Sequence, residues 1–211
     1  MKLFGFDRVL CLSPHPDDVE YSMSGTINRF KGTAFDIFCL SCGTSTDISS
    51  SYERIKEVQL FWETSGMKNI NLIMPENMSL DNLNQAQLIT LIENITIRKH
   101  KYDAIFVPSG EDSHYEHRLV NDTSMALVRN KPISVFEYRT SSSLHSWVPD
   151  VFIDIDGYYA EKINTLRASF KSQIDSIYFE QENLELFHKD FISNKKTALH
   201  RELFKTKIIY T

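Results

Sequence analysis

The sequence predicts an α/β fold of the Rossmann-like kind, in which a mainly parallel sheet is covered by helices on both faces. Short runs rich in β-branched and aromatic residues alternate along the chain with longer amphipathic runs, as in consecutive βαβ units. The short runs are almost continuously apolar, which burial on both faces of a parallel sheet requires. With 211 residues, 42% of them hydrophobic, the chain is expected to form one compact domain.

The individual elements follow from composition and from the residues that flank each run. Strands are expected where short apolar runs stop at Pro, Ser or polar residues: RVLCLSP at 8–14, FDIFCLSC at 35–42, INLIMP at 70–75, DAIFVPS at 103–109, ISVFEY at 133–138 and VFIDI at 151–155. Helices are expected where the following runs are longer and amphipathic: Val19–Phe30, Tyr52–Ser65, Gln85–Lys99, His117–Val128 and Ala160–Lys171.

Charge and cysteine content exclude several classes of protein. The formal charge is -5 at pH 7 and no Lys/Arg cluster recurs at helical spacing, so no nucleic acid or anionic membrane surface is expected as a partner. Asp7 and Arg8 interrupt the apolar N-terminal stretch, and no later run approaches the roughly 18 apolar residues of a membrane span. Cys11, Cys39 and Cys42 fit neither a disulfide framework nor a tetrahedral sulfur site. A cytoplasmic protein acting on a small molecule is therefore expected.

The first concentration of reactive side chains is SPHPDD, where the first strand ends. Asp17 or Asp18 falls where a helix N-cap is expected, and capping alone would explain an Asp-Asp pair. Capping does not explain His15, whose imidazole and the carboxylate of Asp18 can point at one ion across such a turn. Zinc and similar divalent metals accept this mixed N/O pair. A third ligand is then needed from elsewhere in the chain.

A second concentration, PSGEDSHYEHRLV, follows the fourth expected strand and carries His114 and His117 at i, i+3 spacing. In the common doubly wound strand order, strands one and four are neighbours on either side of the switch point, so their following loops line one crevice. Three protein ligands with an open fourth position are typical of a catalytic zinc site. A single histidine here would more often be an ordinary surface residue than a metal ligand. Two histidines that follow the fourth strand, in the same position as the first cluster after the first strand, make the surface interpretation weaker.

These residues carry a resemblance to a known family. PHPDDVE followed by SGTI, the later HYEH, the helix RIKEVQLFWETSG and the segment PDVFIDIDGYYAEKINTLRASFKSQ resemble the PIG-L/LmbE-like family of zinc-dependent N-deacetylases. The similarity runs in order from about Val9 to Gln173. It implies that residues 1–211 form one deacetylase domain. Members hydrolyse the acetamide of N-acetylglucosamine-type sugars on varied aglycones, and some cleave larger amides.

The resemblance also implies roles at matching positions. His15, Asp18 and His117 match the metal ligands, and Asp17 matches the general base. His114 matches the histidine that assists at the reacting carbonyl. The family usually has Asp where this chain has Glu116, which leaves open what contacts the far side of His117.

Three further residues are candidates for substrate binding. By resemblance, Arg54 faces the sugar side of the pocket. Tyr138 and Arg139 end the fifth expected strand and point into the same crevice by topology, although a solvated strand end explains them equally well. The serine-rich loops SCGTSTDISSS and RTSSSLHSW follow strands two and five, where an open α/β sheet places its ligand, but such runs are more often solvated loops.

Together these features predict a hydrolase that removes an N-acetyl group from an N-acetylated amino sugar or its conjugate, with Zn²⁺, or Fe²⁺ in the cell, as cofactor. Asp17 would take the proton of the attacking water, and a protonated His114 would stabilise the oxyanion and protonate the leaving amine. The alternatives are another N-acyl, N-formyl or non-sugar amide at the same site, a Rossmann-like ligand-binding module without chemistry, or a metal-binding scaffold that has lost activity. The sugar, the aglycone and the oligomeric state stay open, a homo-oligomer included.

Overall fold

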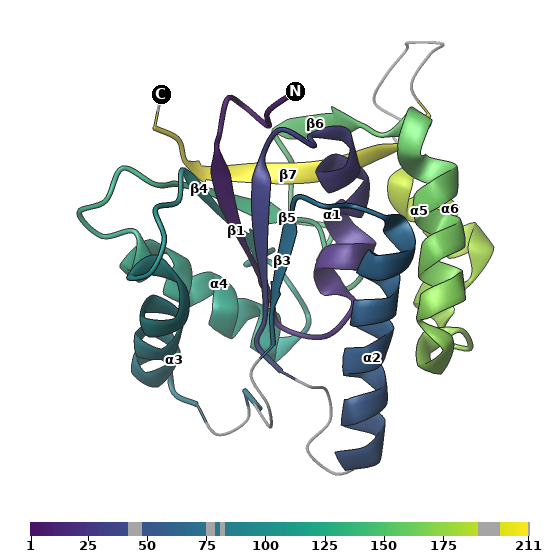
Figure 1. The fold of residues 1–211 in the computed structure, drawn as a ribbon, viewed down its shortest axis with the longest axis horizontal. Coiled ribbons are helices and arrows are strands. Elements are labelled where there is room, and N and C mark those ends of the chain that lie inside the picture. The colour runs from purple at the N-terminus through teal and green to yellow at the C-terminus, as the bar shows by residue number, and fades with distance from the viewer. Residues whose placement is uncertain (42–47, 75–78, 81–82, 190–198, 211) are drawn as a thin grey trace.

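A computed structural model describes residues 1–41, 48–74, 79–80, 83–189 and 199–210 of the chain (Figure 1). Within these residues, strands form one seven-stranded sheet in the order β3-β2-β1-β4-β5-β7-β6. The strands are β1 Arg8–Ser13, β2 Ala34–Cys39, β3 Ile70–Ile73, β4 Ala104–Pro108, β5 Ser134–Tyr138, β6 Val151–Asp154 and β7 Arg201–Ile208. The helices are α1 Asp18–Arg29, α2 Ile48–Ser65, α3 Gln85–Ile92, η1 Glu93–Ile97, α4 Tyr115–Leu127, α5 Asp156–Ser169, η2 Lys171–Gln173, η3 Ile177–Phe179 and α6 Gln181–His188.

The predicted α/β fold with a mainly parallel sheet is confirmed. Strands β1 to β5 pair in parallel, and only β7 runs antiparallel to its two neighbours, β5 and β6. Strands β1 and β4 are direct neighbours, with Val9 opposite Ala104 and Cys11 opposite Phe106. The loops that follow these two strands therefore leave the sheet side by side, as the predicted switch point requires.

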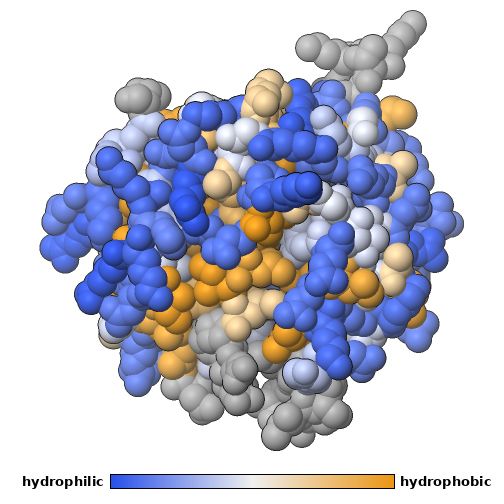
Figure 2. Space-filling view, viewed as in Figure 1, coloured by the Kyte–Doolittle hydropathy of each residue, from blue (hydrophilic) through white to orange (hydrophobic). Residues whose placement is uncertain are grey.

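Helices cover both faces of the sheet, with α1, α2, α5 and α6 on one side and α3 and α4 on the other (Figure 1). Alternate residues of β1 feed the two cores: Val9 and Cys11 pack with the α1 layer, whereas Leu10 and Leu12 pack with the α3 layer. This two-sided burial is the physical reason why the strands are continuously apolar. Figure 2 shows a largely hydrophilic face crossed by a hydrophobic band, over the region where Figure 1 draws the edge strand β3.

Helix α6 and strand β7 were not predicted from the sequence, nor were the short 3-10 helices η2 and η3. Strand β7 enters the sheet between β5 and β6, where its residues Glu202 and Phe204 are almost completely buried. The expected helix Gln85–Lys99 is helical over most of its length, but its second half is the π-helix η1. Thr96 at this point donates its hydroxyl to the Ile92 carbonyl at 2.6 Å, which competes with the regular α-helical pattern.

Among the described residues, no helix combines the length and the apolar character that crossing a bilayer requires.

Candidate active site

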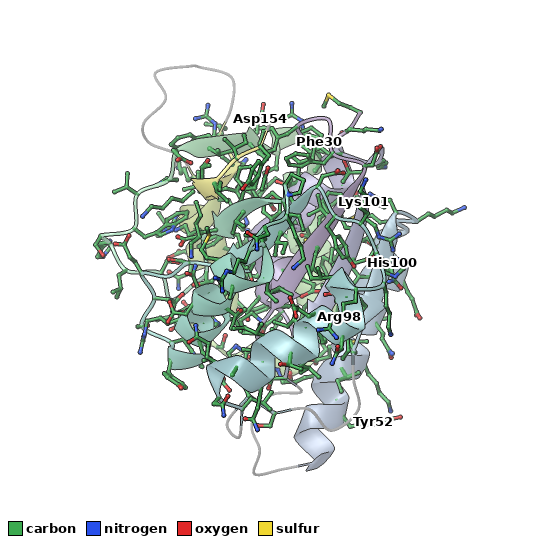
Figure 3. The ribbon with its side chains drawn as sticks, turned by 90° about the vertical axis from the view of Figure 1, so that its left-hand side faces the viewer. Phe30, Tyr52, Arg98, His100, Lys101 and Asp154 are labelled. Carbon is green, nitrogen blue, oxygen red and sulfur yellow. The ribbon has the colours of Figure 1, made fainter. Side chains whose placement is uncertain are left out.

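The turn between β1 and α1 is short and strained. Asp17 has φ 109° and ψ -24°, a backbone conformation that costs an L-residue of order 1–3 kcal/mol. The Asp17 carboxylate makes no capping bond to the helix, whereas Asp18 accepts the backbone N–H of His15 at 2.8 Å. The capping explanation for Asp17 therefore does not hold, and its carboxylate is available for another role. The turn lies at the same end of the molecule as the start of α2, marked by Tyr52 in Figure 3, and opposite to Phe30 and Asp154.

His15, Asp18 and His117 come together although about 100 residues separate the first two from the third. His15 Nδ1 lies 3.2 Å from Asp18 Oδ2 and 3.2 Å from His117 Nε2, and His117 Nε2 lies 3.3 Å from Asp18 Oδ1. A tetrahedral ion with ligands at about 2.0–2.1 Å needs donor atoms about 3.3–3.4 Å apart. The spacing and the mixed N/O chemistry of the three side chains fit a divalent cation such as zinc.

A carboxylate orients each of these two histidines from its far side. His117 Nδ1 is 3.0 Å from Asp112 Oδ2, and His15 Nε2 contacts Glu116. Such carboxylate partners fix the ring and direct the opposite nitrogen towards a metal. The sequence left open which group contacts the far side of His117. In the structure this group is Asp112, whereas Glu116 contacts the far nitrogen of His15.

These carboxylates also make the site favour positive charge. Burial by itself would lower the pKa of His15, but hydrogen bonds to Asp18 and Glu116 raise it to about 9. Burial likewise opposes the charged form of His117, yet the charge of Asp18 and the hydrogen bond to Asp112 raise its pKa to about 10. The same two imidazoles outweigh the burial of Asp18 and hold its pKa well below the usual range. The donor set therefore suits a cation, which would displace the imidazole protons on binding.

Asp17 lies beside this cluster and is held by Arg54 of α2. Arg54 Nη2 donates to Asp17 Oδ2 at 2.9 Å and to the Pro16 carbonyl at 2.7 Å. Burial raises the pKa of Asp17; Arg54 opposes this, and the charge of Asp18 adds to it. A carboxylate of raised pKa in this position can accept a proton near neutral pH. Arg54 thus contacts the predicted base itself and fixes the turn.

His114 is the N-cap residue of α4, with its Nδ1 accepting the Glu116 N–H at 3.3 Å. Its ligand atom lies within 4.8 Å of those of His15 and His117, so it belongs to the same cluster. Burial and the neighbouring His15 and His117 lower the pKa of His114. A neutral ring with its proton on Nε2 fits these contacts, whereas the sequence predicted a protonated ring. Nε2–H can still donate to an oxyanion in that state.

The polar groups of Tyr138 and Arg139 bond to main-chain carbonyls instead of the other predicted site residues. Tyr138 is fully buried and donates its hydroxyl to the Leu12 carbonyl at 2.8 Å, so its ring supports β1 and has no surface open to a substrate. Arg139 donates to the Phe187 carbonyl at 3.1 Å and lies over the Phe187 ring, which attaches it to α6. A strand-end position predicted the place of these residues in the sheet but not the direction of their side chains.

Asp112 was missed by the sequence reasoning and is the centre of a polar network. Its carboxylate accepts hydrogen bonds from the hydroxyl groups of Ser142, at 2.6 Å, and Thr140, and from the backbone N–H of His114 at 2.7 Å. A carboxylate in the loop after β4, five residues before His117, was the available signal. The loop RTSSSLHSW thereby supports the site through Thr140 and Ser142. Much of the other serine-rich loop, SCGTSTDISSS, lies outside the described residues.

A mainly parallel α/β sheet that gathers histidines and carboxylates where β1 and β4 end defines an enzyme-like protein with a candidate metal centre. Comparison with known families identifies the group to which it belongs. The chain belongs to the PIG-L family, whose model, described as GlcNAc-PI de-N-acetylase, matches residues 10–128. This is a family of N-deacetylases, which are hydrolases.

Solved structures share the fold at low sequence identity. The N,N'-diacetylchitobiose deacetylase from Pyrococcus horikoshii, in complex with its inhibitor MPG, is 21% identical with a TM-score of 0.75, and the match covers 96% of this chain and 84% of that one. The zinc-inhibited form of the teicoplanin deacetylase Orf2 is 11% identical with a TM-score of 0.72, covering 95% and 97%. The 4-carboxy-2-hydroxymuconate hydratase GalB from Pseudomonas putida KT2440 is 14% identical with a TM-score of 0.67, covering 97% and 98%. The fold thus accompanies more than one reaction, and the chemistry must be argued from the site.

Proposed function

We propose that this protein is a metal-dependent deacetylase that removes the N-acetyl group from an N-acetylated amino sugar or its conjugate. The observation that carries the proposal is the meeting of three side chains, His15, Asp18 and His117. The two imidazole nitrogens lie 3.2 Å apart, and each lies 3.2–3.3 Å from one of the two Asp18 carboxylate oxygens, spacings that suit the ligands of one tetrahedral ion. When bound there, Zn²⁺ or Fe²⁺ supplies Lewis acidity, which makes water more acidic and an amide carbonyl more electrophilic.

The chain's own residues supply the proton transfers. Asp17, which Arg54 holds next to the cluster, accepts the proton of the water that attacks the amide carbon. His114 Nε2–H donates to the oxygen that becomes negative in the tetrahedral transition state. Acetate leaves, and the amine of the sugar takes up the proton that Asp17 has accepted.

Metal content and amine release measured together test this function. Purified protein is assayed for bound metal and for amine release from N-acetylglucosamine conjugates, with N-formyl, longer N-acyl and non-sugar amides as comparison substrates. We expect N-acetyl sugars to be the best substrates and His117→Ala to lose both metal and turnover. His100→Ala is the matched control, because His100 is exposed beyond η1 and far from the start of α2 (Figure 3).

Several outcomes would overturn parts of the proposal. A preference for formyl, long acyl or non-sugar amides would move the reaction to a different substrate. Tightly bound nucleotide without metal would favour a ligand-binding module. If His117→Ala kept full metal and activity, the ligand set would be wrong, and His114 would become the candidate third ligand.

A further inference from the structure

The loop that joins β5 to β6, here called the β5–β6 loop, runs antiparallel to the short segment before α4. Ser113 donates its backbone N–H to the Ser142 carbonyl at 3.1 Å, and Leu144 donates its backbone N–H to the Glu111 carbonyl at 2.8 Å. Asp112 lies between these two bonds. The main chain of the loop therefore has a fixed register against the residue that contacts the far side of a proposed metal ligand.

Asp112 connects the β5–β6 loop to the candidate metal site. One of its carboxylate oxygens lies 3.0 Å from His117 Nδ1 and accepts the Thr140 hydroxyl, while the other accepts the Ser142 hydroxyl at 2.6 Å. Partners at both oxygens hold the carboxylate in one orientation. That orientation fixes the His117 ring, whose Nε2 faces Asp18 at 3.3 Å. The position of the loop therefore governs how His117 is aimed.

The far end of the β5–β6 loop is anchored by a buried indole. Trp147 is only 6% exposed, and its Nε1–H donates to Glu137 Oε2 at 2.8 Å. Glu137 is equally buried, accepts the side-chain N–H of Asn121 at 2.9 Å and lies 3.8 Å from Lys207 Nζ. Hydrogen bonds to a buried charged group are among the stronger ones in a protein. The anchor thus joins the loop to β5, α4 and β7 at once.

The anchor and the Asp112 contacts belong to one tightly bonded stretch of chain. Trp147 donates its backbone N–H to the Leu144 carbonyl at 3.0 Å, and Leu144 is the residue bonded to Glu111. Thr140 donates its backbone N–H to Ser143 Oγ at 2.9 Å, which closes the other end of the loop. Closely packed and bonded segments transmit a displacement instead of absorbing it. A shift of Trp147 therefore reaches the hydroxyl groups that hold Asp112.

We propose that Trp147 and Glu137 are positioning residues that set the metal affinity of this protein. They hold the β5–β6 loop so that the hydroxyl groups of Thr140 and Ser142 keep Asp112, and through it the His117 ring, in the orientation that binds metal. Because His117 is a metal ligand only under the proposed function, this role rests on that function. It assigns a part in metal binding to residues that are themselves not ligands.

Trp147→Phe tests this role, because phenylalanine keeps an aromatic ring but has no N–H to donate. Glu137→Gln is a second variant, which keeps the size of the side chain and removes the charge that strengthens the bond. Tyr102→Phe is the matched control, since it also removes one hydrogen bond to a buried carboxylate, that of Asp36, at the opposite end of the sheet. Zinc affinity is measured by competition with a chromophoric chelator, alongside kcat, KM and melting temperature.

We expect Trp147→Phe and Glu137→Gln to weaken zinc binding about three- to tenfold, at or below the roughly 10- to 100-fold cost of losing a direct partner of a ligand. Tyr102→Phe should leave the zinc affinity unchanged even if it lowers the melting temperature by a similar amount. A merely structural role of Trp147 would instead lower the melting temperature and leave the zinc affinity at the wild-type value.

A double-mutant cycle shows whether Trp147 acts through the loop hydroxyl groups. In a protein that already carries Thr140→Val and Ser142→Ala, Trp147→Phe should cause no further loss of zinc affinity, because the groups that it positions are gone. A full additional loss there, an unchanged affinity in the single variants, or an equal loss in Tyr102→Phe would overturn the proposal. Absence of amine release from every sugar would reject the deacetylase function, while the zinc affinities would still decide the role of Trp147.

Discussion

Asp17 combines two properties that rarely occur together in one residue. Its backbone has a positive φ, which is uncommon outside glycine, and its partly buried carboxylate bonds to an arginine instead of the helix amides. Strain of this kind persists only where the surrounding structure enforces it, and it gathers at functional sites. Here the strained turn places the Asp17 and Asp18 carboxylates on different sides, one towards Arg54 and one towards the histidines.

The variant Asp17→Asn distinguishes two possible roles of Asp17, namely accepting a proton in the reaction and only holding Arg54 in place. Asn has nearly the same size, tolerates positive φ and still accepts a hydrogen bond from Arg54, so fold and metal content should be retained. It cannot take up the proton, so kcat should fall about 10²–10⁴-fold. The measurements are kcat, bound metal and melting temperature on one preparation. A fully active, metal-replete variant would require another base. The next candidate would be Glu20, which is buried and accepts the Trp62 indole N–H at 2.5 Å.

At the scale of single residues, the sequence predicted which side chains meet more reliably than it predicted where they point. His15, Asp18, His114 and His117 meet because strand order alone brings their two loops together. Tyr138 was placed in the crevice, but it turns into the core, because the direction of a strand-end side chain depends on packing that no local pattern reports.

At the scale of elements, α1 is joined to β7 by a buried carboxylate. Glu202 accepts the backbone N–H groups of Gly25 and Thr26 at 2.9 and 2.6 Å, although these lie in the middle of a helix. Lys162 of α5 donates to the same carboxylate at 2.5 Å. Gly25 is the glycine of the SGTI motif, and this close approach of helix and strand explains why a side chain is absent there.

Gly25→Ala should destabilise the protein even though alanine is the better helix former by about 1 kcal/mol. A Cβ atom would lie 2.9 Å from Glu202 Oε1 and 3.0 Å from two atoms of Ile155. The Glu202 carboxylate cannot move away, because its hydrogen bonds to Lys162 and to the α1 amides hold it in place. We expect a loss of about 1–3 kcal/mol in the free energy of unfolding, measured in denaturant. Gly157→Ala in α5 is the control, because nothing lies within 4 Å of its added Cβ. Equal stabilities of the two variants would contradict a rigid contact at Gly25.

The composition of strand β7 explains why sequence reasoning missed it. Strand β7 reads RELFKTKI, in which charged residues interrupt the apolar ones, so it lacks the continuous apolar run by which the other strands were recognised. Its charged Glu202 is buried because Lys162 and two helix amides satisfy it. Such compensation comes from parts of the chain that are distant in sequence, which local patterns do not report.

At the scale of the whole molecule, the alternation of apolar and amphipathic runs was sufficient to predict the layered sheet and the neighbourhood of β1 and β4. The order of the last strands was not predictable in this way, because β7 returns antiparallel between two strands that precede it in the chain.

The end of the sheet opposite to the site carries its own polar cluster. Asp36 of β2 accepts two hydrogen bonds from Arg8 at 2.8 and 2.9 Å and one from Tyr102 at 2.5 Å.

This cluster should make the stability of the whole molecule depend on pH in the acid range. Burial would raise the pKa of Asp36, but the hydrogen bonds from Arg8, Tyr102 and Asn71 outweigh it and lower the pKa below 3.8. A carboxyl group with a lowered pKa stabilises the folded state above its unfolded pKa, and this contribution disappears as the pH falls through the folded value. The contribution of Asp36 is therefore complete at neutral pH and is lost below about pH 4.

Asp36→Asn should accordingly lower the free energy of unfolding by about 1.5–3 kcal/mol at pH 7, since it weakens hydrogen bonds to a charged group. The difference from the wild type should stay constant down to about pH 5 and then shrink as the wild-type carboxylate takes up its proton. Urea unfolding of both proteins between pH 3 and 8 measures it. The exposed Asp122→Asn serves as the control and should stay within about 0.5 kcal/mol throughout. A difference that persists undiminished at pH 3 would mean that the Asp36 contacts do not depend on its charge.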